Sequence, residues 1–141
     1  MITLLTDYGH DGSYVGVCHG VIYSIAPDAT VIDVAHTVDE YNILQGAMML
    51  ADAVPYLPVG VHLAVVDPGV GSGRRAIAVR CADGRHYVGP DNGVLMEAAR
   101  ASGIVEAAEI RLPDRVAGRT QPARDRAATF DGRDVFAPTA A

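Results

Sequence analysis

The chain contains little of what marks several large classes of protein. Its 141 residues include two cysteines, no tryptophan and no lysine. Two cysteines cannot build a disulfide framework, and Cys18 and Cys81 lack the close spacing of metal ligands. We therefore expect both to be reduced core thiols in a cytoplasmic protein.

Long apolar runs and clusters of positive charge are also missing. No stretch approaches the roughly 20 apolar residues of a membrane span, and Met1 leads directly into a short strand-like run rather than a signal peptide. The chain has 11 arginines and 17 acidic residues, which gives a net charge of −6. These features predict no membrane and no nucleic-acid partner, and they favour a small ligand, such as a cationic one.

Several catalytic motifs are absent as well. There is no Gly-x-Ser-x-Gly elbow and neither cysteine lies beside an obvious base, so covalent catalysis has no candidate nucleophile. The glycine-rich loop at 69–73 resembles a phosphate cradle but lacks the lysine of a P-loop. The five histidines show no paired-ligand spacing, so we predict no metal site.

What the chain does have is an alternation of strand-like and helix-like segments, in a sequence that is 50% apolar. This order predicts one α/β domain over residues 1–141, with a mainly parallel central sheet flanked by helices and an added hairpin. Strands are expected at 2–6, 30–36, 63–66 and 104–110. The hairpin is expected at 76–81 and 86–89, helices at 14–25, 42–54 and 94–101, and a surface loop at 111–128.

Acidic or amide side chains follow three of the predicted strands, at Asp7, Asp67 and Asp91-Asn92. Because parallel strands end at one edge of a sheet, we expect these groups to converge on a single ligand site. Asp7 could accept the hydroxyls of a ribose, or could simply cap a helix. Asp67 beside Arg74 could orient or deprotonate a water, or could cap the turn that follows it.

Four motifs carry a family resemblance, and together they span nearly the whole chain. They are Thr6-Asp7-Tyr8-Gly9, the segment 65–72 (VVDPGVGS), the segment 89–93 (GPDNG) and the segment 129–138 (TFDGRDVFAP). In this order they resemble the S-adenosyl-L-methionine hydroxide adenosyltransferases, relatives of the fluorinating and chlorinating enzymes. The resemblance implies attack of water on the 5′ carbon of S-adenosyl-L-methionine, which releases adenosine and L-methionine without any other cofactor.

The resemblance also implies roles for individual residues. Asp7 matches the acid that holds the ribose diol, and Asp67 and Arg74 match two members of the set that activates water. The positions expected to line the ribose and nucleophile pocket are Tyr14, Tyr41, Thr129 and Gly132. An acid at position 67 and glycine at position 132 favour the hydrolytic branch over the fluorinating one.

Two features depart from the family pattern. Its histidine falls on Asp131, which could complete the catalytic set or could pair with Arg133 or Arg126. The family also has a C-terminal β-barrel domain and a trimeric site between subunits. This sequence reads as the N-terminal domain alone, cut within the linking helix, so we expect a homotrimer whose β-barrel domain could reside on another chain.

Three functions therefore remain open from the sequence. The first is hydrolysis of S-adenosyl-L-methionine. The second is a non-catalytic nucleoside-binding or trimer-assembly module, and the third is a phosphate-ligand binder that uses the glycine loop.

Overall fold

The computed structural model describes residues 1–111, 115–116, 119–120 and 130–141. Six strands form the central sheet in the order β2-β1-β3-β5-β4-β6. They are β1 (Ile2–Thr6), β2 (Val31–Ala35), β3 (Val61–Val65), β4 (Ala76–Cys81), β5 (His86–Pro90) and β6 (Ile104–Glu109). The helices are α1 (Tyr14–Ile25), α2 (Ile43–Ala53), η1 (Val54–Tyr56), α3 (Met96–Ala101), η3 (Gly132–Phe136) and α4 (Ala137–Ala140).

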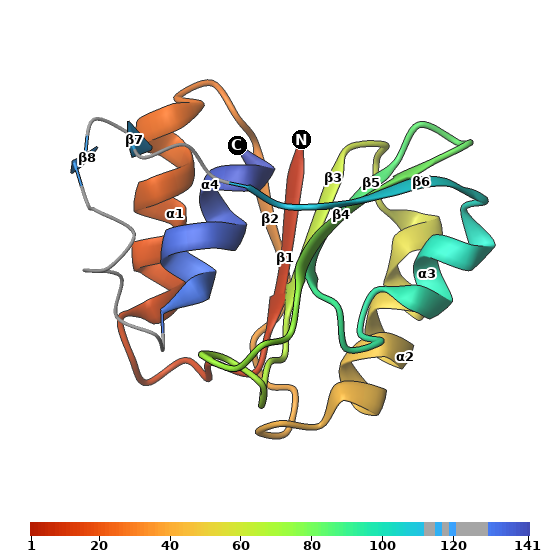
Figure 1. The fold of residues 1–141 in the computed structure, drawn as a ribbon, viewed down its shortest axis with the longest axis horizontal. Helices are drawn as coiled ribbons and strands as arrows, with labels where there is room; N and C mark the ends of the chain where they lie inside the picture. The colour runs from red at the N-terminus through yellow and green to blue at the C-terminus, as the bar shows by residue number, and fades with distance from the viewer. Residues whose placement is uncertain (112–114, 117–118, 121–129) are drawn as a thin grey trace.

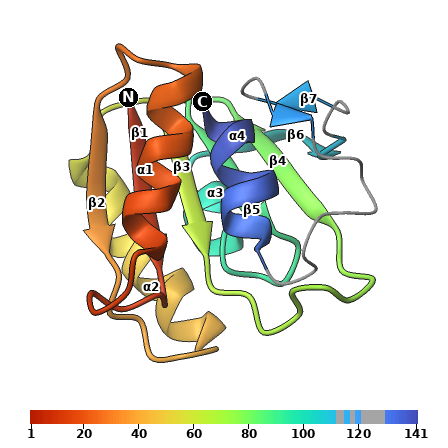
Figure 2. The ribbon, with the colours of Figure 1, turned by 90° about the vertical axis from the view of Figure 1, so that its left-hand side faces the viewer.

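The predicted α/β class is confirmed, including the hairpin. Strands β2, β1, β3 and β5 are parallel neighbours, whereas β4 runs antiparallel to both β5 and β6. Helices α1 and α4 cover one face of the sheet, and α2 and α3 cover the other (Figure 1). Figure 2 shows α1 and α4 lying next to each other over the first face.

The centre of the sheet is buried on both faces because its strands are mostly apolar, and the buried polar side chains of Thr3, Thr6 and His62 are hydrogen-bonded. All five residues of β1 are buried, and so are four of the five in β3. Leu5 packs into the core below α2 and α3, while the adjacent Leu4 packs into the core below α1 and α4. The alternation along β1 therefore anchors both layers, and it fixes the point at which Asp7 leaves the sheet.

One expectation for the C-terminal third is wrong. The segment 111–128 was predicted to be a loop without secondary structure, but it includes two short antiparallel strands, β7 (Arg115–Val116) and β8 (Arg119–Thr120). The other residues from 112 to 129 lie outside the described part of the chain. Both cysteines are buried free thiols, as expected. Among the described helices, none has the length and apolarity needed to cross a membrane.

A buried histidine makes the stability of this fold dependent on pH. His62 in β3 is fully buried, with Nδ1 2.9 Å from Thr3 Oγ1. Burial, assisted by the nearby charge of Arg85, lowers the pKa of His62 from 6.5 to about 4. The folded protein therefore holds the neutral imidazole, while the unfolded chain takes up a proton at higher pH.

We predict that the free energy of unfolding falls by roughly 3 kcal/mol as the pH drops from about 6.5 to about 4, in urea titrations. The loss occurs in this window because His62 binds a proton more readily when the chain is unfolded. His62→Asn, which can keep a polar contact with Thr3, should remove this component. His86→Asn, a change at an exposed histidine, should leave this pH-dependent component in place. An unchanged pH profile in His62→Asn would assign the acid sensitivity to other groups.

Candidate active site

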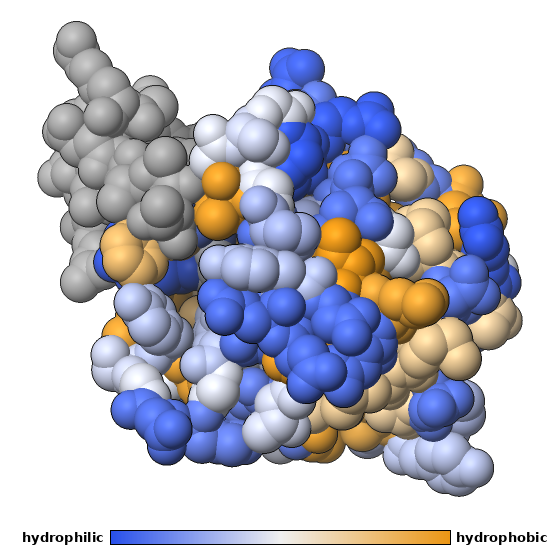
Figure 3. Space-filling view, turned by 90° about the horizontal axis from the view of Figure 1, so that it is seen from below, coloured by the Kyte–Doolittle hydropathy of each residue, from blue (hydrophilic) through white to orange (hydrophobic). Residues whose placement is uncertain are grey.

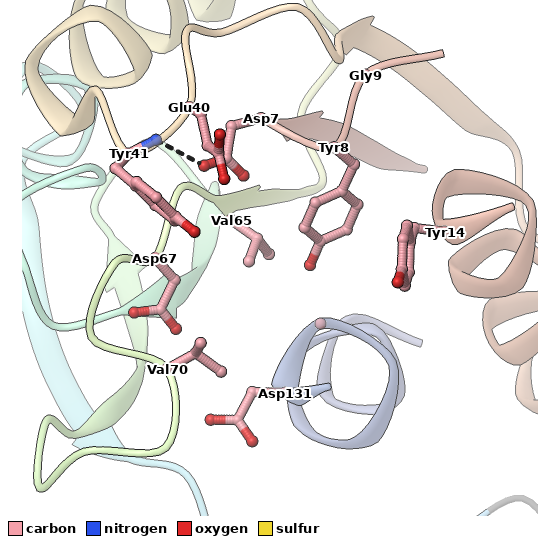
Figure 4. A pocket seen from close by; sticks show the side chains of 11 residues that line it. Asp7, Tyr8, Gly9, Tyr14, Glu40, Tyr41, Val65, Asp67, Val70 and Asp131 are labelled. Atoms are coloured by element: carbon pink, nitrogen blue, oxygen red, sulfur yellow. Dashed lines mark hydrogen bonds between the residues drawn. The ribbon is translucent and has the colours of Figure 1, made fainter. Parts of the chain in front are cut away.

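A cavity of about 430 Å³ opens at the edge of the sheet where β1 and β3 end. Figure 3 views the molecule from this side, and hydrophilic surface occupies the middle of the face with apolar surface beside it. Figure 4 shows the pocket walls, which come from the ends of β1 and β3, the loop before α2, α1 and the start of η3. The lining residues are Asp7, Tyr8, Gly9, Tyr14, Glu40, Tyr41, Val65, Asp67, Val70, Asp131 and Gly132.

Asp7 stands at one side of the pocket, immediately after β1. The backbone N–H of Tyr41 donates a hydrogen bond to Asp7 Oδ2 at 3.1 Å (Figure 4). Tyr41 makes this contact with a φ of 65°, which is unusual for a residue other than glycine. A strained backbone held at this point is consistent with a site whose geometry matters.

Desolvation makes Asp7 a weaker acid than an exposed aspartate. Burial raises the pKa of Asp7, the Tyr41 N–H opposes the rise, and the carboxylates of Glu40 and Asp67 add to it. A ligand that donates hydrogen bonds to the ionised carboxylate would replace the lost hydration. Two neighbouring hydroxyl groups have this chemistry.

A cluster of two carboxylates and one guanidinium stands at the other side. Arg74 Nε donates to both oxygens of Asp67, at 3.1 Å and 2.9 Å, and Arg74 Nη2 contacts Asp67 and Asp131. The Asp67 side chain is 5% exposed and that of Arg74 is 13% exposed. The planar fork of arginine suits this bridging role, because a lysine ammonium lacks the fixed geometry.

Packing holds Arg74 in place from behind. Its Cζ lies 5.2 Å from the ring centroid of the fully buried Phe136, in a cation–π arrangement. Burial disfavours the charged guanidinium, but the hydrogen bonds that Arg74 donates to Asp67 and Asp131 outweigh it and raise the pKa of Arg74. Arg74 is therefore a permanent cation between two acids, and both carboxylates are oriented by it.

Asp131 enters the site from a distant part of the sequence. It precedes η3, a π-type helical turn of the sort that often occurs at functional sites. The sequence left open whether Asp131 joins the catalytic set or pairs with Arg133. In the structure Asp131 pairs with Arg74, and Arg133 pairs with Asp134. Arg126 and the predicted pocket residue Thr129 lie outside the described residues.

The expected convergence of Asp91 and Asn92 on the pocket is wrong. Arg75 Nε donates to Asp91 Oδ2 at 2.8 Å, and Asp91 is not among the residues that line the pocket. Asn92 Nδ2 donates to the backbone oxygen of Val66 at 2.8 Å. Asn92 therefore supports the backbone next to Asp67 and does not line the pocket.

Sequence reasoning missed Tyr8 and Glu40, which both line the pocket. Each is adjacent in sequence to a residue that had been selected, and neither has a spacing that distinguishes it. Burial, followed by the nearby Cys18 and the acidic groups, raises the pKa of Tyr8, so the phenol remains protonated. The Tyr8 ring lies 5.9 Å from that of Tyr14, and together the two rings form an aromatic wall.

Gly132 is a glycine because Tyr8 occupies the space of a side chain. A Cβ at position 132 would lie 2.0 Å from Tyr8 Oη and 3.1 Å from Cζ. We predict that Gly132→Ala destabilises the fold by about 1–3 kcal/mol in urea unfolding, because the phenol must move. Tyr8→Phe removes Oη, so the double variant should recover part of the loss. If the changes in unfolding free energy of Gly132→Ala and Tyr8→Phe simply add in the double variant, the proposed contact is wrong.

The geometry of the pocket defines a class of protein. It is an α/β domain with an acidic, partly aromatic pocket at the carboxyl edge of a parallel sheet, where such folds bind their ligands. Among the described residues, no cluster of three or more histidine, cysteine or acidic side chains is placed to hold a metal ion.

Comparison with known proteins identifies the family. The model of the SAM hydroxide adenosyltransferase N-terminal domain matches residues 2–141. A curated (R)-S-adenosyl-L-methionine hydrolase of Salinispora arenicola is 52% identical, over 99% of this chain and 51% of that protein. A fluorinase of Actinopolyspora mzabensis is 28% identical, over 97% of this chain and 52% of its own length.

A solved structure has the same fold as this chain. An uncharacterized conserved protein of Thermotoga maritima superposes with a TM-score of 0.90 at 40% identity, over 99% of this chain and 52% of the other. The chain belongs to the SAM hydroxide adenosyltransferase family and matches its N-terminal domain. It spans about half the length of the curated relatives it matches.

Proposed function

We propose that this chain carries the water-activating half of an S-adenosyl-L-methionine hydrolase, which forms adenosine and L-methionine. The observation that carries the proposal is a single pocket with Asp7 on one side and the Asp67–Arg74–Asp131 cluster on the other. The names of the curated relatives, at 40% to 52% identity, support the same reaction.

In this proposal Asp7 accepts hydrogen bonds from the two ribose hydroxyls and so fixes the sugar. Tyr14 and Tyr41 are walls of the nucleoside pocket, and Gly132 leaves room for Tyr8. Thr129 is proposed to line the same pocket on the strength of the family motif alone. The acidic lining suits a substrate whose sulfur carries a positive charge.

The chemical step is a displacement at carbon. Asp67 accepts a proton from a water molecule as the water oxygen attacks the ribose 5′ carbon. The bond from that carbon to sulfur breaks, and its electron pair stays on sulfur, which becomes the neutral thioether of methionine. Arg74 holds Asp67 and Asp131 in position, and Asp131 takes the place at which the family motif has histidine.

The proposal extends to the state of the protein in the cell. We propose a cytoplasmic homotrimer in which a β-barrel domain, on this or another chain, supplies further contacts to adenine and methionine. This rests on the resemblance and on the half-length match to the relatives. Light scattering of the purified protein should give three subunits, and a monomer at assay concentration would contradict the trimer.

Incubation with S-adenosyl-L-methionine tests the reaction, with adenosine and methionine quantified together. The chain should be assayed alone and with the C-terminal domain of the Salinispora relative added. We expect equimolar release of the two products, faster in the mixture because adenine contacts improve orientation. If neither reaction releases adenosine and methionine, the hydrolase function is excluded and a non-catalytic nucleoside-binding module is favoured. Thermal stabilisation by inorganic phosphate alone would instead favour the phosphate binder.

A further inference from the structure

A second set of polar groups lies behind Asp7, and the proposed reaction makes no use of it. Its centre is His36, which directly follows β2 and is 2% exposed. His36 Nδ1 lies 2.9 Å from Oγ1 of the fully buried Thr6. The backbone oxygen of His36 also accepts a hydrogen bond from Gly9 N–H at 2.8 Å. One buried histidine thus contacts the chain on both sides of Asp7.

The surroundings of His36 favour one tautomer of its ring. Its Nε2 lies 3.1 Å from Asp33 Oδ1, and that same oxygen is 2.8 Å from His19 Nε2. Nε2 makes no hydrogen bond of standard geometry, but the Asp33 carboxylate beside it favours the tautomer that carries hydrogen on Nε2. Nδ1 is then an acceptor, and the Thr6 hydroxyl donates to it.

This assignment orients the next hydrogen bond as well. With its hydrogen directed at Nδ1, Thr6 Oγ1 presents a lone pair, and it accepts from the backbone N–H of Tyr8 at 3.2 Å. The contacts therefore run from Asp33 through His36 and Thr6 to the peptide that follows Asp7. The residues before and after Asp7 are both fixed, and the carboxylate has little freedom to turn away from the pocket.

We infer that His36 is a positioning residue for Asp7, and that Asp33 and Thr6 serve it in the same role. The inference rests on the proposed function, in which Asp7 accepts the ribose hydroxyls. Two hydrogen bonds to a diol require the carboxylate at a defined angle, so a loosened turn costs affinity for the diol in particular. His36 itself does not touch the substrate.

Matched variants separate this role from a general contribution to folding. Thr6→Ser keeps the hydroxyl, whereas Thr6→Val has nearly the same shape and lacks it. His36→Asn can place a polar atom near the position of Nδ1, whereas His36→Gln places one near Nε2 and leaves Thr6 without its acceptor. In each pair the variant that keeps the polar contact, Thr6→Ser or His36→Asn, loses more bulk than its partner, so a purely structural role predicts the larger effect in that variant.

The test measures binding of adenosine and of 2′,3′-dideoxyadenosine by calorimetry on the purified protein, with thermal unfolding recorded for each variant. The wild type should prefer adenosine by roughly 10- to 100-fold, because loss of the diol leaves Asp7 unpaired. Thr6→Val and His36→Gln should reduce this preference about tenfold, mainly by weakening adenosine binding. Thr6→Ser and His36→Asn should retain most of it.

The outcomes distinguish this inference from the proposed function. If the wild type shows no preference for the diol, the ribose role of Asp7 is wrong and the inference falls with it. If the wild type discriminates and folded Thr6→Val discriminates equally, only the positioning role is overturned. If both members of each pair lose the preference for adenosine equally, and the loss follows the fall in their unfolding temperatures, His36 has only a structural role.

Discussion

Replacing Asp67 by asparagine should lower the rate of adenosine release by about 10²- to 10⁴-fold. Asparagine has nearly the same size, and its amide oxygen can still accept from Arg74, but it cannot take a proton from water. The change therefore removes the proposed base and preserves much of the cluster around it. The measurement is the single-turnover rate at saturating S-adenosyl-L-methionine, so that altered affinity does not enter.

Asp91→Asn provides the matched control. Asp91 ends a neighbouring parallel strand and is ion-paired with an arginine, as Asp67 is, but its partner is Arg75 and it lies outside the pocket. An exposed pair of this kind contributes little, so the rate should stay within about twofold of the wild type. Equal loss in the two variants would mean that the effect is structural, and full activity in Asp67→Asn would remove Asp67 from the mechanism.

Replacing Arg74 by methionine should destabilise the fold by about 3–5 kcal/mol and abolish turnover. Methionine fills much of the space against Phe136, but the two carboxylates then face each other without a cation. The stability loss is measured as the free energy of unfolding in urea at neutral pH. Addition of Asp131→Asn should recover part of it, because one of the opposed charges is then gone.

The neighbouring arginine again supplies the comparison. Arg75 is 65% exposed at its side chain and pairs with Asp91, so Arg75→Met should change the unfolding free energy by less than about 1 kcal/mol. A similarly small effect in Arg74→Met would show that the charges of the buried cluster do not stabilise the fold.

Much of the fold could be predicted from local sequence pattern. The apolar run 63–66, which covers most of strand β3 and stops at an acid and a proline, has few alternatives in a buried sheet. The hairpin of β4 and β5 was indicated by its Asp-Gly turn, and Gly84 has a φ of 87°. Strands β7 and β8 were missed because two-residue strands have no period to detect.

The site was predictable where it depended on topology and unpredictable where it depended on pairing. Asp7 and Asp67 follow adjacent parallel strands, so their convergence follows from the sheet. Asp91 also follows a parallel strand, but it pairs with Arg75 and does not line the pocket, and the sequence does not reveal this pairing. Asp131 reaches Arg74 across 57 residues of sequence, and only the family motif marked it beforehand.

The most direct test of the central claim is the origin of the oxygen in the product. The reaction is run in water labelled with heavy oxygen, and the adenosine released is analysed by mass spectrometry with fragmentation at the ribose. Attack of the Asp67-bound water on the 5′ carbon predicts one heavy oxygen, located in the 5′ hydroxyl. Release of adenosine that carries only ordinary oxygen would contradict the mechanism.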